Sequence, residues 1–450
     1  MRYKLSRAST AQLEAVMRRL RANSRLFCAV TALLALLPAC GARSTLWDGS
    51  LAEAAVGGSS GGISAEAGAP NAGSGGATPH DSCVPNPCLH GGTCASVAGV
   101  TSCTCPKAFV GQHCELPRFE LLEKPAACSA LPNAFFVPTD LSGDGRVVVG
   151  YCSASFMPSR QPPDLAFRWS RADGYIKLLP PGSTTGRTSY YGTVTAGTGT
   201  GLDRFGAAQP VPILWRSDTA ENLTTVKGSA IAVSGDGSFT VGDALGVGAT
   251  RWRSATSFAA LPVPNGATFC SAADTNGNGS VTLGICDTTR AVIWYDSGVT
   301  AMLDPIAGAS TMSELRLSAD GAVVAGIARD LVARNGLSYA FRWTAGSGPI
   351  ILDPNGDSIG VNDVSGDGAV IVGTRLDPNW ITSARPAVWR SGQRQDLEAL
   401  LTSSGAELAG WSPETVNAIS DDGELVVGVA YTGGNIDDTR PYLAHLSDAP

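Results

Sequence analysis

The sequence predicts an all-β protein: a seven-bladed β-propeller of four-stranded blades, preceded by a small disulfide-rich domain. Three observations carry this prediction. The chain has 54 glycines in 450 residues while only 16% of its residues are charged, a composition that suits many turns between short strands. A pattern of Gly, four residues and Gly returns seven times. A short apolar segment with a tryptophan follows most copies, so the last 310 residues or so form a repeat architecture.

The N-terminus is predicted to be a targeting signal. Four arginines between 18 and 25 precede an apolar run from Leu26 to Leu37. A basic region, a short apolar region and small residues at the end are typical of a secretory signal peptide, here residues 1–39. The segment Leu37-Pro38-Ala39-Cys40 resembles the bacterial lipobox, which implies lipidation of Cys40. The alternative is an ordinary cleaved signal with an incidental cysteine, and either Met1 or Met17 is the true start.

The segment that follows is predicted to be a flexible tether. Residues 40–80 are mostly Gly, Ser and Ala with few large apolar groups, so they cannot form a core. Gly41, where enteric bacteria place Asp for inner-membrane retention, favours the outer membrane. We therefore expect an exported chain anchored in the outer membrane, at the cell surface or in the periplasm.

Residues 81–116 contain six cysteines in the order Cys-x4-Cys-x5-Cys-x8-Cys-x-Cys-x8-Cys. A unit this small lacks the apolar area for a core, so cross-links must supply much of its stability. The spacing, with His90-Gly91-Gly92-Thr93 and Gly111-Gln112-His113 beside cysteines, resembles an EGF-like domain. That resemblance selects one of fifteen pairings: Cys83–Cys94, Cys88–Cys103 and Cys105–Cys114.

Residues 118–450 are predicted to form the propeller. The turn glycines of the seven copies are assigned to Gly145, Gly201, Gly237, Gly279, Gly321, Gly368 and Gly423, five of them after an Asp. Asp-Gly supplies the positive φ that a tight hairpin turn requires. The third strand of each copy carries a tryptophan in six cases, and its usual job would be packing between blades. This repeat resembles the HAF repeat of bacterial extracellular proteins, as in Ala166-Phe167-Arg168-Trp169 and Ala340-Phe341-Arg342-Trp343.

The two ends of the repeat region are expected to meet. The last copy has no fourth strand before the chain stops, whereas residues 118–124 have the pattern of a fourth strand directly after the cysteine module. We expect this segment to complete the last blade and cover its exposed edge. An open β-solenoid is the alternative, but the variable spacing of the copies fits a propeller better.

Four cysteines remain in the repeat region. Cys270 and Cys286 flank a predicted hairpin turn almost symmetrically, as a cross-strand pair would. Cys152 holds the same place in the first copy as Cys286 does in the fourth, and its available partner is Cys128. An even number of paired cysteines is typical of an oxidising compartment.

No cofactor and no metal is expected. The best weak calcium candidate is Asp274 with Asn276 and Asn278, which partly resembles an Asp-x-Asp-x-Asp-Gly loop. The acid that closes such a loop is missing, and hairpin turn chemistry explains the pattern without a metal. Catalysis is not expected either, because no histidine lies between 114 and 444, which disfavours His-based or zinc sites.

We expect a monomeric binding or adhesion protein that recognises an extracellular protein or glycan. A net charge of −7 disfavours nucleic acid, and the lipid would be the only membrane contact. The long loops predicted on one face supply the candidate residues, since aromatic residues and arginine in loops suit recognition: Arg160, Arg187, Tyr190, Tyr191, Trp380, Trp411, Tyr431, Asp437 and Asp438. The alternatives are a carbohydrate-active enzyme (a glycoside hydrolase or lyase) and an envelope-assembly scaffold.

Overall fold

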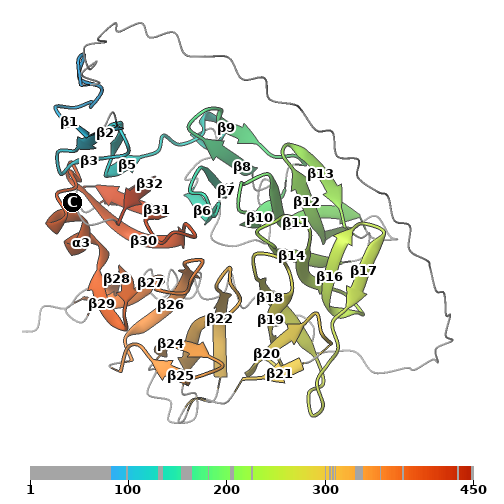
Figure 1. Cartoon of the computed structure of the whole chain (residues 1–450). Coiled ribbons are helices and arrows are strands. Elements are labelled where there is room, and N and C mark those ends of the chain that lie inside the picture. The colour runs from blue at the N-terminus through green and yellow to red at the C-terminus, as the bar shows by residue number, and fades with distance from the viewer. Residues whose placement is uncertain are drawn as a thin grey trace, which may run out of the picture.

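A computed structural model places seven four-stranded sheets around a common centre, with a small disulfide-rich domain at the rim (Figure 1). It describes residues 83–97, 100–129, 135–153, 165–180, 182–202, 207–223, 227–298, 300–303, 306, 309, 311–329, 338–354, 356–377, 380–432 and 435–446. The fold class predicted from the sequence is therefore confirmed. The predicted signal peptide, Cys40 and the tether lie outside the described residues.

The small domain consists of two short hairpins held by disulfides. Strands β1 (Thr93–Val97) and β2 (Val100–Thr104) form one antiparallel pair, and β3 (Phe109–Val110) and β4 (Leu116–Pro117) form the other. Its disulfides are Cys83–Cys94, Cys88–Cys103 and Cys105–Cys114. These are the pairs that the EGF-like resemblance implies.

Each blade is an antiparallel sheet whose strands run from a, nearest the centre, to d at the rim. Blades one to four contain the following strands: β6 (Phe135–Leu141), β7 (Val147–Ser153), β8 (Leu165–Ser170) and β9 (Gly174–Lys177); β10 (Thr184–Thr188), β11 (Val194–Leu202), β12 (Ala208–Arg216) and β13 (Thr219–Asn222); β14 (Gly228–Val233), β15 (Thr240–Ala244), β16 (Gly248–Ser254) and β17 (Ser257–Ala260); β18 (Cys270–Thr275), β19 (Val281–Cys286), β20 (Arg290–Tyr295) and β21 (Thr300–Met302).

Blades five to seven continue the same order. They contain β22 (Thr311–Leu317), β23 (Val324–Arg329), β24 (Ser338–Thr344) and β25 (Gly348–Ile351); β26 (Ser358–Val364), β27 (Val370–Asp377), β28 (Trp380–Arg390) and β29 (Gln393–Asp396); β30 (Trp411–Ile419), β31 (Leu425–Thr432), β32 (Asn435–His445) and β5 (Phe119–Leu121).

Blade seven is completed by the segment that precedes blade one. Strand β5 pairs antiparallel with β32, with Phe119 opposite Ala444 and Leu121 opposite Tyr442. The rings of Phe119 and Tyr442 stack with centroids 5.3 Å apart. This closure matches the pairing expected from the sequence, and it covers an edge that would otherwise expose unpaired backbone groups.

The turn of blade two lies nine residues earlier than the glycine pattern suggested. Strand β10 ends at Thr188, and the a–b turn runs through Ser189, Tyr190, Tyr191 and Gly192, whose φ is 66°. Gly201 instead lies within β11, opposite Gln209. The assignment of Gly201 to this turn was wrong because Tyr191 stands where five other copies have Asp, while Gly192 and Gly197 repeat the same spacing.

The second glycine is required by a close approach between strands in six of the seven copies, all but Gly326. An added Cβ at Gly284 would lie 2.3 Å from the Ser271 carbonyl oxygen and 2.4 Å from the ring of Trp294. The register of strand a shifts beside this point in blade four, between Ala272 and Asp274, as a β-bulge does. The bulge and the tryptophan together leave no room for a side chain.

The strand-c tryptophans pack between blades, as expected. Trp215, Trp252, Trp294 and Trp389 are each at most 3% exposed. The indole of Trp215 donates a hydrogen bond to Leu179 O in the preceding blade at 2.6 Å. The indole of Trp294 donates in the same way to Pro262 O at 2.7 Å, so in these two blades the N–H is satisfied where the neighbouring strand d has ended.

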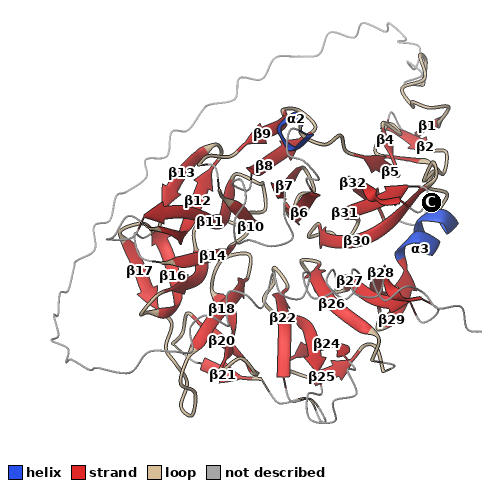
Figure 2. Ribbon diagram, turned by 180° about the vertical axis from the view of Figure 1, so that it is seen from behind, coloured by secondary structure: helices blue, strands red, loops and turns tan. Residues whose placement is uncertain are grey.

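Two helices lie at the rim, as Figure 2 shows from behind: α2 (Ala126–Ser129) and α3 (Leu397–Ser403). Two more disulfides lie within the propeller, Cys128–Cys152 and Cys270–Cys286. Among the described residues, no helix has the length and apolarity needed to span a bilayer.

Candidate functional site

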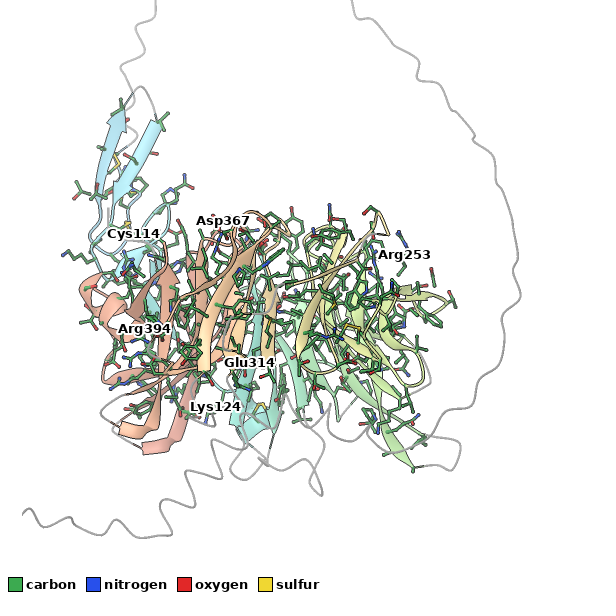
Figure 3. The ribbon with its side chains drawn as sticks, turned by 90° about the horizontal axis from the view of Figure 1, so that it is seen from below. Cys114, Lys124, Arg253, Glu314, Asp367 and Arg394 are labelled. Carbon is green, nitrogen blue, oxygen red and sulfur yellow. A yellow bond between two sulfur atoms is a disulfide. The ribbon has the colours of Figure 1, made fainter. Side chains whose placement is uncertain are left out.

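The two faces of the propeller differ in the turns that they carry. The a–b turns lie on the face where Asp367 appears in Figure 3, whereas Lys124 lies on the opposite face with the b–c loops. The EGF-like domain rises on the side of the a–b turns (Figure 3). Two of the four longest b–c loops lie largely outside the described residues, at 154–164 and 330–337.

A closed belt of backbone hydrogen bonds joins the seven a–b turns. Each turn donates one N–H to the next turn, and the seventh donates back to the first, at distances of 2.8 to 3.0 Å. The donors and acceptors are Asp144 to Tyr190, Tyr190 to Gly235, Asp236 to Gly277, Gly277 to Ala319, Asp320 to Gly366, Gly366 to Asp421 and Asp421 to Gly143. The belt draws the inner strands together around the axis at this face.

A small cavity lies on the axis below the belt, with a volume of about 70 Å³, and all seven inner strands contribute to its wall. The residue two positions before the turn serine or asparagine holds an equivalent position in strand a of every blade. Around the ring these residues are Asp140, Arg187, Ala232, Asp274, Arg316, Asp363 and Ala418. Asp140, Arg187, Asp274 and Asp363 line the cavity, so the repeat places charged groups together on the axis.

Arg187 is the centre of a buried charge cluster. Its Nη1 lies 3.1 Å from Asp140 Oδ1 and 2.6 Å from Asp363 Oδ1, and its Nη2 lies 3.6 Å from Asp274 Oδ2. The three aspartate side chains are at most 7% exposed, and that of Arg187 is 19% exposed. One arginine of blade two therefore connects blades one, four and six across the axis.

The same aspartates also join neighbouring blades. Asp140 Oδ2 accepts the N–H of Thr188 at 2.7 Å, and Asp363 Oδ2 accepts that of Ile419 at 3.0 Å. Asp274 Oδ2 accepts the N–H of Leu317 at 3.0 Å. Each donor lies in strand a of the next blade, so every carboxylate has both an arginine and a backbone partner, as buried charges require.

Burial raises the pKa values of two aspartates in the cluster, Asp140 and Asp274. Burial, and then the neighbouring Asp363 and Asp274, raise the pKa of Asp140 to about 7 although Arg187 opposes this shift. Burial also raises the pKa of Asp274. Burial alone would lower the pKa of Arg187, but the three carboxylates raise it well above its ordinary value. A second buried arginine, Arg316, opposes the rise at Asp274.

Only two of the seven belt positions beside the cavity carry a side chain larger than a methyl group. The residue after the turn serine or asparagine is glycine in blades one, three, four and six and Ala319 in blade five, but Tyr190 in blade two and Asp421 in blade seven. Both line the cavity. Tyr190 and Tyr191 are 39% and 66% exposed, and their rings meet edge to face at 4.8 Å.

The nine candidate residues do not form one surface. Arg187 lies in the axial cluster, and the two tyrosines lie in an a–b turn, on the face opposite the loops to which they were assigned. This correction follows from the register of blade two. Trp411 and Tyr431 are half-buried in β30 and β31, and Arg440 lies 5.5 Å from the Trp411 ring centroid. Arg160 and the side chains of Trp380, Asp437 and Asp438 lie outside the described residues.

The three side chains of the weak calcium candidate each interact with a different partner. Asp274 faces Arg187, Asn276 Oδ1 accepts the N–H of Val281 at 2.9 Å, and Asn278 Oδ1 accepts that of Ser280 at 3.0 Å. The two asparagines accept backbone hydrogen bonds within the turn, and the aspartate pairs with Arg187 on the axis. Within the described ranges, no three His, Cys, Asp or Glu residues are grouped so that they could hold a metal ion.

Sequence reasoning did not bring Asp140, Asp363 and Asp421 together in one site; Asp140 and Asp363, like Asp274, only begin partial calcium-loop patterns. A usable signal existed: aligning the copies on the turn serine places Asp140, Arg187, Asp274 and Asp363 at one repeat position. The same alignment shows Tyr190 and Asp421 as departures from small residues. It required the correct turn of blade two, which the pattern at Gly201 obscured.

Residues 83–113 match the family of the EGF-like domain. Two solved structures resemble the chain in fold. TolB from Acinetobacter baumannii is 14% identical with a TM-score of 0.39, covering 58% of this chain and 62% of that one. An oligogalacturonate lyase from Vibrio parahaemolyticus is 9% identical with a TM-score of 0.46, covering 74% of this chain and 97% of that one. Similarity at this level concerns the fold alone.

Proposed function

We propose that this is an exported binding protein that recognises an extracellular protein or glycan through its propeller. The observation that carries the proposal is the exposed pair Tyr190 and Tyr191, of which Tyr190 lines the axial cavity together with Asp421. Exposed aromatic residues next to a polar hollow are typical of recognition surfaces. The EGF-like domain and the five disulfides support an extracellular setting.

The experiment is a binding screen with the full chain displayed on cells. Labelled glycans and secreted or cell-surface proteins from neighbouring cells serve as probes. We expect a subset of probes to bind the wild type and to lose binding to the double variant Tyr190→Ala/Tyr191→Ala. Phe258→Ala is the matched control, because Phe258 is 54% exposed on the outer strand β17. Binding of no probe, or equal binding by the tyrosine variant, contradicts the proposal.

A lipid anchor is part of the proposal. The lipobox resemblance at Cys40 implies that the chain is acylated and held in the outer membrane. The full chain with Cys40→Ser should then be released into the soluble fraction, while the wild type stays with the membranes and incorporates labelled palmitate. Retention of the Cys40→Ser chain in the membrane would point to a different mode of attachment.

A carbohydrate-active enzyme is the second candidate, because Asp140 and Asp363 both contact Arg187 Nη1 in the cavity. Two features argue against it. Each carboxylate also accepts a backbone N–H, and a cavity of about 70 Å³ is far smaller than the roughly 300–1000 Å³ of most ligand pockets. Release of reducing or unsaturated ends from polysaccharides, lost in Asp363→Asn with the fold intact, would favour the enzyme.

A further inference from the structure

We propose that the mouth of the axial cavity binds one positively charged side chain, Arg or Lys, presented by a protein ligand. This inference rests on the proposed binding function and adds the chemistry of its ligand. The site, here called the belt pocket, consists of Gly143, Tyr190, Tyr191 and Asp421. It lies where Tyr190 and Asp421 stand in place of the glycine or alanine that the other five blades have at this position.

The belt pocket occupies three consecutive blades. Asp421 of blade seven and Tyr190 of blade two flank blade one, whose residue at the same belt position is Gly143. A Cβ added to Gly143 would lie 2.4 Å from Tyr190 Cδ2 and 2.7 Å from Asp421 Oδ2. The tyrosine ring and the carboxylate therefore both lie against this glycine, as neighbours at the rim of the cavity.

Asp421 is a carboxylate without a cation. Its side chain makes no hydrogen bond or ion pair with any residue that the structure describes, unlike those of Asp140 and Asp363. Burial and the carboxylate of Asp363 raise its pKa to about 6, with smaller contributions from Asp422 and Asp144 that Arg187 only partly offsets. A cation bound here would remove this unfavourable interaction.

The wall of the cavity contains more aspartates than arginines. Four aspartates line it together with a single arginine, Arg187, which is already engaged by three of them. The two tyrosines add electron-rich ring faces, which attract guanidinium and ammonium groups. Charge and ring chemistry at the mouth thus favour the same class of ligand group.

The size of the cavity favours the end of one side chain over a sugar ring. A volume of about 70 Å³ accommodates a compact group at the rim, while the exposed face of Tyr191 remains available for an aliphatic stem or a flat guanidinium. The backbone of the ligand would then lie across the a–b turns.

The test uses the full chain and three fluorescent seven-residue peptides of Gly and Ser with a central Arg, Lys or norleucine. Fluorescence anisotropy should show binding of the Arg and Lys peptides and at least about tenfold weaker binding of the neutral one. Asp421→Asn should weaken the Arg peptide by about tenfold or more. Glu424→Gln, which removes an exposed charge from the same hairpin, is the matched control and should leave affinity unchanged.

Two further measurements separate the pocket from general acidity. The methyl group of Gly143→Ala would overlap Tyr190 and Asp421 and force both side chains to shift without removing a charge, so this variant should also weaken peptide binding. Affinity should fall as the pH drops through about 6, because Asp421 then takes up a proton. Asp421→Asn should lose this pH dependence.

Equal binding of the charged and neutral peptides, or full affinity in Asp421→Asn, overturns the inference. If only neutral or amino-sugar oligosaccharides from the glycan screen compete at the tyrosine pair, the proposed binding function stands and the ligand class named here is wrong. If neither the peptides nor the wider screen give binding, both proposals fail.

Discussion

At the level of single residues, the two glycines of a repeat have different structural roles. The first, such as Gly279 with a φ of 70°, provides a turn conformation that other residues rarely adopt. The second, such as Gly284, is needed for space rather than for conformation, because the Ser271 carbonyl of strand a and the Trp294 ring occupy the place that a Cβ would take. Sequence periodicity finds both glycines but does not distinguish these roles.

Gly284→Ala should lower the free energy of unfolding by about 1–3 kcal/mol, since the added methyl overlaps the Ser271 carbonyl and the Trp294 ring. Urea unfolding followed by tryptophan fluorescence measures this change. Gly346→Ala is the control: nothing lies within 4 Å of its added Cβ and its φ is not positive, so its stability should match or slightly exceed that of the wild type. Similar losses in both variants would contradict the steric argument.

At the level of elements, the outer strand of blade seven comes from the far end of the propeller sequence. Strand β5 follows β4 of the EGF-like domain after a single residue, Arg118, which is 1% exposed. Arg118 Nε donates to Lys107 O at 2.8 Å, and Arg118 O accepts the N–H of His445 at 2.9 Å. The closing strand therefore also joins the small domain to the ring.

Removing the Phe119 side chain should test this closure. Phe119 is 7% exposed and stacks on Tyr442, so Phe119→Ala should cost about 3–5 kcal/mol. Hydrogen exchange should show the largest loss of protection in β32 and β31 of blade seven. Uniform loss across all blades would mean that the ring unfolds as one unit rather than opening at its closure.

At the level of the whole molecule, the blades are held together in two ways near the axis. The belt uses backbone groups and depends little on side-chain identity. The cluster around Arg187 uses side chains from blades one, two, four and six, which are distant in sequence. The first links neighbours around the ring, and the second links blades across it.

Arg187→Met should leave three buried aspartates without their common cation. Removing one partner of a buried ion pair typically costs about 3–5 kcal/mol, and we expect at least this loss at pH 8 in thermal or urea unfolding. The loss should shrink at pH 5, because Asp140, whose pKa is about 7, then takes up a proton. A variant as stable as the wild type at pH 8 would show that the cluster adds nothing to the ring.

The wild type should be more stable at pH 5 than at pH 8. The folded-state pKa values of Asp140, Asp243 and Asp421 are raised from 3.8 to about 7, 6 and 6, all chiefly by burial. The folded protein therefore binds more protons between these limits, so stability falls as pH rises through them. His445 acts oppositely: burial lowers its pKa from 6.5 to about 4, so its contribution is lost as pH falls through that window.

Free energies of unfolding at pH 5 and 8 measure the balance of these four groups. The three carboxyls lower stability as pH rises, whereas the one histidine raises it, so the free energy of unfolding should fall from pH 5 to pH 8. Asp140→Asn should make this fall smaller. Below about 3.8 the trend should reverse, since hydrogen bonds lower the pKa of turn aspartates such as Asp367. Rising stability from pH 5 to pH 8 would exclude the carboxyls as the dominant groups.

The order of residues alone was enough to predict seven blades and the strand that closes the ring, because turn glycines and strand-c tryptophans are local patterns that repeat. The cysteine pairs of the small domain were implied by its resemblance to an EGF-like domain. The axial cluster and the belt pocket required the tertiary structure. Arg187 meets Asp363 from a strand 176 positions away only because the ring brings strand a of every blade to one axis. Tyr190 and Asp421 become neighbours for the same reason: closure places blade seven beside blade one, and no local pattern encodes that contact.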